Sequence, residues 1–136
     1  MYQIDISGDS RFPVDKKRIQ KTISRVLGDF DVGGDVSVSV RVVGDRKMKQ
    51  LNSDFRKLTK TTDVLSFPTE VVKKGGGFKN GASEFLYPQE EPFPLGDVVI
   101  SFPRARDQAA EKNVFLDDEV ARLIEHGVKS LLGMHE

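Results

Sequence analysis

Residues 117–136, DDEVARLIEHGVKSLLGMHE, are the stretch of this chain that decides most about its fold. Apolar residues recur there at intervals of three and four, which predicts a helix over residues 117–132. The expected buried stripe consists of Val120, Leu123, Ile124, Val128 and Leu131. His126 and Ser130 are four residues apart, so they share one side of the helix at the edge of that stripe. Gly133 can adopt a positive φ, end the helix and turn the chain back.

Both histidines of the chain, His126 and His135, lie in this stretch. Positions 126, 130, 133 and 136 have the spacing H-x3-H-x2-G-x2-H, which is typical of enzymes that hold a metal ion on one helix. The second ligand position is Ser130 and the third, by strict spacing, is Glu136. The stretch therefore predicts the scaffold of a metal site in which one histidine ligand is replaced.

The composition predicts one globular domain over residues 1–136. The chain is 38% hydrophobic and 31% charged, as is usual for a soluble protein. No apolar run approaches the roughly 20 residues needed to span a bilayer, and the N-terminus has no signal-peptide pattern. With no cysteine, disulfides and thiolate ligands are excluded. We expect a cytoplasmic protein with no membrane partner.

The charges are unevenly distributed along the chain. Residues 1–80 hold 16 Lys and Arg against 10 Asp and Glu, whereas residues 81–136 hold 5 against 11. A basic half facing an acidic half can orient a polyanion; solvated surface is the other interpretation. The same two interpretations apply to four cations of the second expected helix and its end: Arg46, Lys47, Lys49 and Lys57.

The rest of the chain predicts an alternation of strands and helices. Strands are expected over residues 2–7, 35–43, 62–67 and 95–102, and helices over 13–27, from 44 onward, and over 103–113. Met48, Leu51 and Phe55 are expected to form the apolar side of the second helix. Residues 72–94, rich in Gly and Pro, predict a long loop insertion. The order βαβαββαα predicts an α+β fold: a single mixed β-sheet covered by helices, with a zincin-like C-terminal helix.

Three parts of the chain resemble the YbeY family. The first is LNSDFR at residues 51–56 followed by TDVLSFP at 62–68. The second is LGDVVIS at residues 95–101 with Gln108-Ala109 after it, and the third is His126-Gly127 through Gly133. Their order and spacing agree with the family over roughly residues 35–136.

The resemblance implies a metal-dependent, single-strand-specific endoribonuclease that acts in ribosomal RNA maturation in the bacterial cytoplasm. It implies one zinc or other divalent metal ion per chain, held in the family by three histidines. Implied partners are ribosomal RNA and the ribosome or small-subunit assembly proteins. The arginine that the family associates with activity falls on Arg56.

This chain departs from the family at the metal ligands, where Ser130 replaces a histidine and the family's Y-D-H reads Met134-His135-Glu136. In one interpretation, His135 or Glu136 joins His126 in a site with two protein ligands, which water or a residue elsewhere completes. In a second, the site has decayed and the protein only binds RNA or the ribosome. In a third, the C-terminus as given is shortened or altered. Our expected metal ligands are His126, His135 and Glu136.

Arg56 is the expected catalytic cation, because its planar donors can grip the scissile phosphate. Glu136 is the expected proton acceptor, with His135 as the alternative. A hydrolase with another substrate, such as a peptide, is a further rival. Gly127 stands where zincin proteases carry a glutamate base, which argues against that rival.

Overall fold

The structure is a computed structural model that describes residues 1–56, 62–69 and 92–134. These residues form one mixed sheet and four helices, in the predicted order βαβαββαα. The elements are β1 (Tyr2–Gly8), α1 (Lys16–Asp29), β2 (Val36–Val43), α2 (Asp45–Arg56), β3 (Val64–Pro68), β4 (Phe93–Ser101), α4 (Phe102–Lys112) and α5 (Leu116–Leu131). The predicted α+β fold is confirmed. That residues 1–136 form one domain stays a prediction.

The four strands lie in the order β1-β2-β4-β3. β1, β2 and β4 are parallel, and β3 pairs antiparallel with β4 at the edge of the sheet. The parallel strands are joined by crossovers, as parallel pairing requires. The edge position of β3 leaves one side of that strand without a neighbour among the described strands.

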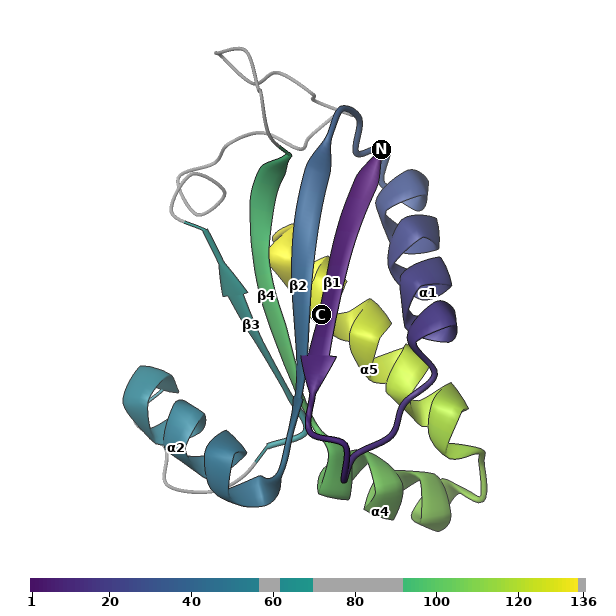
Figure 1. Ribbon diagram of the computed structural model, residues 1–136, viewed down its shortest axis with the longest axis vertical. Helices are drawn as coiled ribbons and strands as arrows, with labels where there is room; N and C mark the ends of the chain where they lie inside the picture. The colour runs from purple at the N-terminus through teal and green to yellow at the C-terminus, as the bar shows by residue number, and fades with distance from the viewer. Residues whose placement is uncertain (57–61, 70–91, 135–136) are drawn as a thin grey trace.

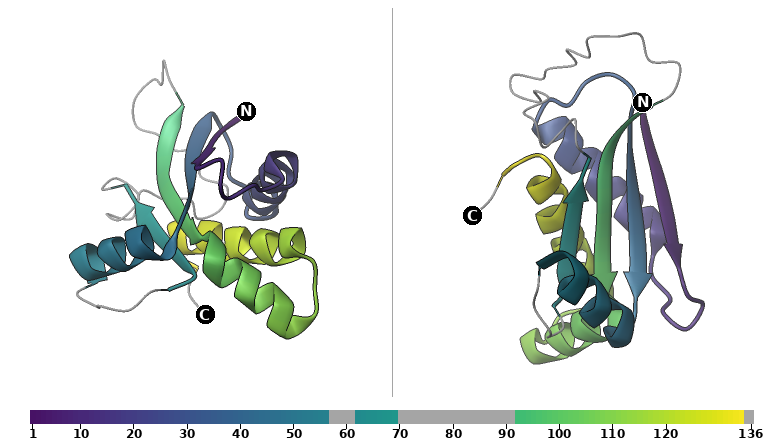
Figure 2. Two further views of the ribbon diagram at one scale, coloured as in Figure 1. Left: turned by 60° about the horizontal axis from the view of Figure 1, so that its bottom comes forward. Right: turned by 90° about the vertical axis from the view of Figure 1, so that its left-hand side faces the viewer.

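One face of the sheet is covered by α1 and α5, which lie side by side on it (Figures 1 and 2). The apolar stripe that the helical period predicts for α1 (Ile19, Ile23, Val26 and Leu27) is buried, and so is every member of the stripe predicted for α5. These side chains pack against alternate residues of the strands, among them Val38, Val40 and Val98. The apolar residues of α1 and α5 therefore recur with the helical period that was predicted, because each helix buries one side on the pleated sheet.

Among the described residues, the opposite face is covered only in part, by α2. Met48 packs with Val43, Leu65 and Val99, and Leu51 is half-buried against this cluster. Phe55, predicted to belong to the same apolar side, is 64% exposed. Phe55 therefore lies on the predicted apolar side, where its ring contacts Phe67, but most of its surface is exposed.

Several predicted boundaries differ from the structure by one to three residues, and two of these differences have a clear cause. The first helix begins at Lys16, after Asp15 accepts a hydrogen bond from the Arg18 N–H as its N-cap, and not at Pro13. β4 begins at Phe93, which pairs with Val36, so the loop predicted for residues 72–94 ends earlier than expected. Residues 72–91 of that loop lie outside the described part of the chain.

Within that described part, we find no helix with the length and apolar character needed to cross a membrane.

Candidate metal and RNA site

The two helical positions of the predicted metal motif lie near the end of α5. His126 is exposed and Ser130 is half-buried, one helical turn further on. Side chains four residues apart on a helix lie on the same side. Positions 126 and 130 therefore lie on the same side of α5, beside its buried stripe, whereas their joint role as metal ligands stays a prediction.

The turn after α5 is built by Gly133, which has a φ of 82°. The Met134 N–H donates to the Lys129 carbonyl at 2.8 Å, and the Gly133 N–H donates to the Ser130 carbonyl at 3.0 Å. This pair of bonds is a Schellman motif, which ends a helix through a residue in the left-handed region. The predicted turn is thus confirmed, and it redirects the chain immediately before His135 and Glu136, which lie outside the described residues.

Gly127 sets how closely α5 approaches the sheet beside His126. A Cβ atom at Gly127 would lie 2.6 Å from Val98 Cγ1 and 3.2 Å from Val64 Cγ2. The carbonyl of Gly127 accepts a hydrogen bond from the Ser66 hydroxyl of β3 at 2.9 Å. The close packing and this bond hold the helix turn that carries His126 against β3 and β4.

β3 also links this turn to the end of α2. Ser66 faces α5, whereas the next residue, Phe67, lies on the opposite face and contacts the Phe55 ring with centroids 4.9 Å apart. Arg56, the last residue of α2, follows Phe55 directly. One edge strand therefore positions the helix end that carries Arg56 and the helix turn that carries His126.

The start of the segment 62–68 is anchored to α4. The Gln108 amide donates to the Asp63 carboxylate at 3.1 Å, and the Ser101 N–H donates to the Asp63 carbonyl at 2.9 Å. Asp63 and Gln108 belong to two of the sequence segments that indicated the family resemblance. Their role in this structure is to join β3 to the beginning of the C-terminal helices.

Glu125, next to His126, is held by two cations. Lys129 donates to its carboxylate at 2.8 Å, and Arg25 of α1 bonds its other oxygen. The hydrogen bond from Lys129, followed by that from Arg25, lowers the pKa of Glu125. Because both oxygens are engaged, this carboxylate is a support for α5 and a poor candidate for a base.

The described residues contain no group of three His, Cys, Asp or Glu side chains that could hold a metal ion. His126 supplies one imidazole there, and the neutral hydroxyl of Ser130 is a weak donor for zinc. His126 and Ser130 therefore do not make a site by themselves. The other two predicted ligands, His135 and Glu136, lie outside the described residues.

Sequence reasoning missed the Ser66–Gly127 bond and a basic pocket that includes Arg41. The alternation of Val with Ser and Arg in residues 36–41 was the available signal, since it places Arg41 on the polar face of β2. The sequence gave no reason to expect that Arg41 of β2 and Lys47 of α2 line the same pocket, which is described below.

Comparison with known proteins agrees with the sequence resemblance. The family model described as Endoribonuclease YbeY matches residues 5–136. The chain is 38% identical over 128 residues to an Endoribonuclease YbeY of Caldicellulosiruptor saccharolyticus, covering 88% of this chain and 77% of that protein. It is also 38% identical over 120 residues to an Endoribonuclease YbeY of Aquifex aeolicus, covering 88% of this chain and 69% of that protein.

A solved structure supports the fold assignment. The solution structure of TM1509 from Thermotoga maritima matches with a TM-score of 0.57, at 22% sequence identity, over 98% of this chain and 73% of that one. At this identity the match concerns the fold alone. The family model and the two relatives carry the assignment, and by them this chain belongs to the YbeY endoribonuclease family.

Proposed function

We propose that this protein is a metal-dependent, single-strand-specific endoribonuclease that acts in ribosomal RNA maturation in the cytoplasm. The observation that carries the proposal is the exposed His126 on a helix turn pinned to the edge strand of the sheet, in a chain of this family. That geometry offers an imidazole to solvent on a rigid support, as a hydrolytic metal site requires.

We assign the metal ligands to His126, His135 and Glu136, with Ser130 at the position of the remaining histidine. A zinc or other divalent ion bound there would supply positive charge for the phosphoryl oxygens and acidify a water molecule. With a carboxylate and a hydroxyl in the donor set, harder ions such as Mn²⁺ become competitive with zinc.

The remaining chemistry belongs to the chain itself. Arg56 would grip the scissile phosphate with its planar donors and offset the charge that develops during cleavage. Glu136, when it is not a ligand, would accept the proton of the attacking water, with His135 as the alternative acceptor. Partners would be ribosomal RNA and the ribosome or small-subunit assembly proteins.

A relative that binds RNA but has lost its metal is the alternative, suggested by the replacement of a histidine by Ser130, whereas membership of the endoribonuclease family favours the enzyme. The two candidates differ in cleavage. The untagged protein, purified without chelator, should be analysed for metals by elemental mass spectrometry and then tested on end-labelled single-stranded and double-stranded RNA.

About one metal ion per chain, with cleavage of single strands that EDTA abolishes, would support the enzyme. Tight RNA binding with no cleavage after supply of Zn²⁺ or Mn²⁺ would establish the binding protein instead. A peptide substrate panel run under the same conditions would detect the remaining rival, a metal-dependent peptide hydrolase.

A further inference from the structure

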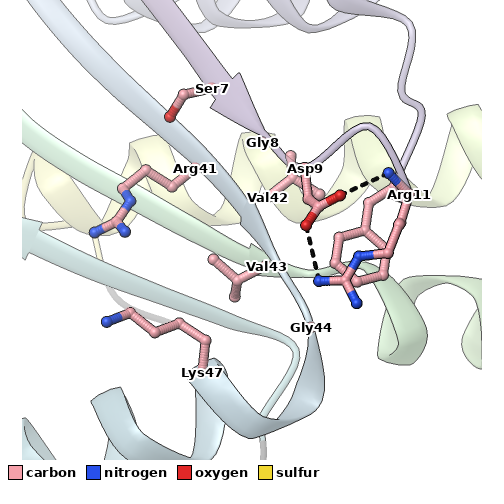
Figure 3. A pocket seen from close by; sticks show the side chains of 10 residues that line it. Ser7, Gly8, Asp9, Arg11, Arg41, Val42, Val43, Gly44 and Lys47 are labelled. Carbon is pink, nitrogen blue, oxygen red and sulfur yellow. Dashed lines mark hydrogen bonds and ion pairs between the residues drawn. The ribbon is translucent and has the colours of Figure 1, made fainter.

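A basic pocket lies on the sheet face opposite α5, between the end of β1 and the start of α2 (Figure 3). Its volume is about 330 Å³, and its lining includes Ser7, Arg11, Arg41 and Lys47. Figure 3 shows the Arg41 and Lys47 side chains extending on the same side of the pocket. Val40 belongs to the core beneath α1 and α5, so the neighbouring Arg41 points to the other face of β2.

The charges of this pocket are not balanced. Arg11 donates to the carboxylate of Asp9 at 2.8 Å, so these two opposite charges offset one another. Arg41 and Lys47 are exposed, and neither makes an ion pair or hydrogen bond with any residue of the described part of the chain. Two unengaged cations at the rim of a cavity favour a ligand with negative oxygens.

We propose that Arg41 and Lys47 form a phosphate subsite for the backbone of single-stranded RNA, separate from the site of cleavage. The proposal rests on the endoribonuclease function proposed above and extends its substrate-binding surface. α5 and His126 belong to one side of the sheet, whereas Arg41 and Lys47 belong to the other. Arg56 lies at the far end of α2 from Lys47, so the subsite holds a part of the RNA strand away from the scissile bond.

Neighbouring charges determine the direction in which the bound RNA runs across the protein surface. The next row of the sheet places Asp5 and Asp97 beside Ser39, on the same face as Arg41. Their carboxylates repel a phosphate backbone, so the bound RNA does not extend further across β1 and β4. α2 gives the alternative direction, because Lys47, Leu51 and Phe55 succeed one another at intervals of four along one side of the helix.

Phe55 explains why the ligand is a nucleic acid strand and not a free phosphate ion. Its ring is 64% exposed and stands edge-on to Phe67, which fixes its orientation. It lies about 12 Å from Lys47 along the helix axis, within reach of a base on the same strand. Cations that hold phosphates, together with an exposed aromatic ring, are the usual features of single-strand binding surfaces.

The test measures the affinity of a fluorescein-labelled single-stranded RNA by anisotropy over a salt series, in EDTA so that cleavage does not interfere. The double variant R41Q/K47Q is compared with K17Q/K21Q, which removes two exposed cations of α1. We expect R41Q/K47Q to bind the RNA about tenfold more weakly. The plot of the logarithm of the binding constant against the logarithm of the salt concentration should become less steep by about 1.4, or about 0.7 for each lost phosphate contact. K17Q/K21Q should keep the wild-type slope.

A third variant, Phe55→Leu, separates RNA from other anions. It should weaken RNA binding about tenfold through lost stacking, and leave the salt slope unchanged. Competition by inorganic phosphate with no effect of Phe55→Leu would overturn the RNA strand as the ligand. A polyglutamate peptide that binds as tightly as RNA, and loses affinity equally in R41Q/K47Q, would also overturn it.

Equal affinity and slope of the wild type and R41Q/K47Q would refute the subsite even if the wild type cleaves RNA. Equal losses in R41Q/K47Q and K17Q/K21Q would refute it too, because they would reflect net charge alone. Conversely, specific weakening in R41Q/K47Q with no cleavage by the wild type would support the subsite while the proposed endoribonuclease function fails. Circular dichroism and urea unfolding should show that all variants fold equally.

Discussion

The hydroxyl of Ser66 donates a hydrogen bond to the carbonyl of Gly127 at 2.9 Å, across 61 positions of sequence. Ser66 lies in the segment TDVLSFP, and Gly127 directly follows His126. The two segments that indicated the family most clearly are therefore in direct contact. In this structure, the segment at residues 62–68 acts as the support of the helix turn that presents His126.

Gly127→Ala should lower the free energy of unfolding by about 1–3 kcal/mol, because the added methyl group overlaps Val98 and Val64 unless α5 shifts. Urea denaturation measures the change. Gly28→Ala is the matched control, since it also lies in a helix but has nothing within 4 Å of its added Cβ. That control should be neutral or stabilising by about 0.4–1 kcal/mol. Equal effects of the two changes would contradict the close approach of α5 at Gly127.

Arg56→Ala should reduce kcat/KM for RNA cleavage by about 100-fold while the fold is kept, because a cation that offsets transition-state charge is lost. The comparison is Arg46→Ala, which removes an exposed arginine from the other end of α2. Unchanged turnover in Arg56→Ala, measured with initial rates on the same single-stranded RNA, would remove Arg56 from the site.

Ser130→His should raise zinc affinity by at least about tenfold, because it places a second imidazole one helical turn after His126. Isothermal titration or competition with a chromophoric chelator measures the affinity. Ala110→His, on the exposed side of α4, introduces a histidine away from the motif and should have no such effect. If Ser130→His gains nothing over this control, positions 126 and 130 do not share a metal ion.

Glu119 should make stability depend on pH below its ordinary pKa of 4.5. This carboxylate is 2% exposed and bonds Arg122 at 2.7 Å and Lys112 at 3.0 Å. The hydrogen bond from Arg122, and then that from Lys112, lowers its pKa against the opposing effect of burial. The stabilisation is therefore fully present above the unfolded pKa and is lost as the pH falls through the folded one.

The corresponding experiment compares the wild type with Glu119→Gln by urea unfolding between neutral and acid pH. At pH near 7 the variant should be less stable by about 1–3 kcal/mol, and the difference should shrink below pH about 4.5. Glu111→Gln, an exposed change on α4, should show no difference at either pH. A gap for Glu119→Gln that stays constant with pH would mean that the charge of Glu119 is not what stabilises the fold.

The sequence by itself determined the order of the elements, the buried stripes of α1 and α5, and the turn at Gly133. These follow from local rules: the helical period decides which side is buried, and a glycine accepts a positive φ of 82°. The segment motifs also determined the family. The sequence did not determine the first residues of α1 and β4, because these depend on the N-cap at Asp15 and on the pairing of Phe93 with Val36.

Only the tertiary structure decided which distant residues meet. The bond between Ser66 and Gly127 depends on β3 being the antiparallel edge strand, and local sequence does not encode strand order. The helical period placed Phe55 on the apolar side of α2, but only the tertiary structure shows that it contacts Phe67 and stays largely exposed. Arg41 and Lys47 share a pocket because the chain turns at Gly44, between the end of β2 and the start of α2, and the end of β1 supplies the other wall.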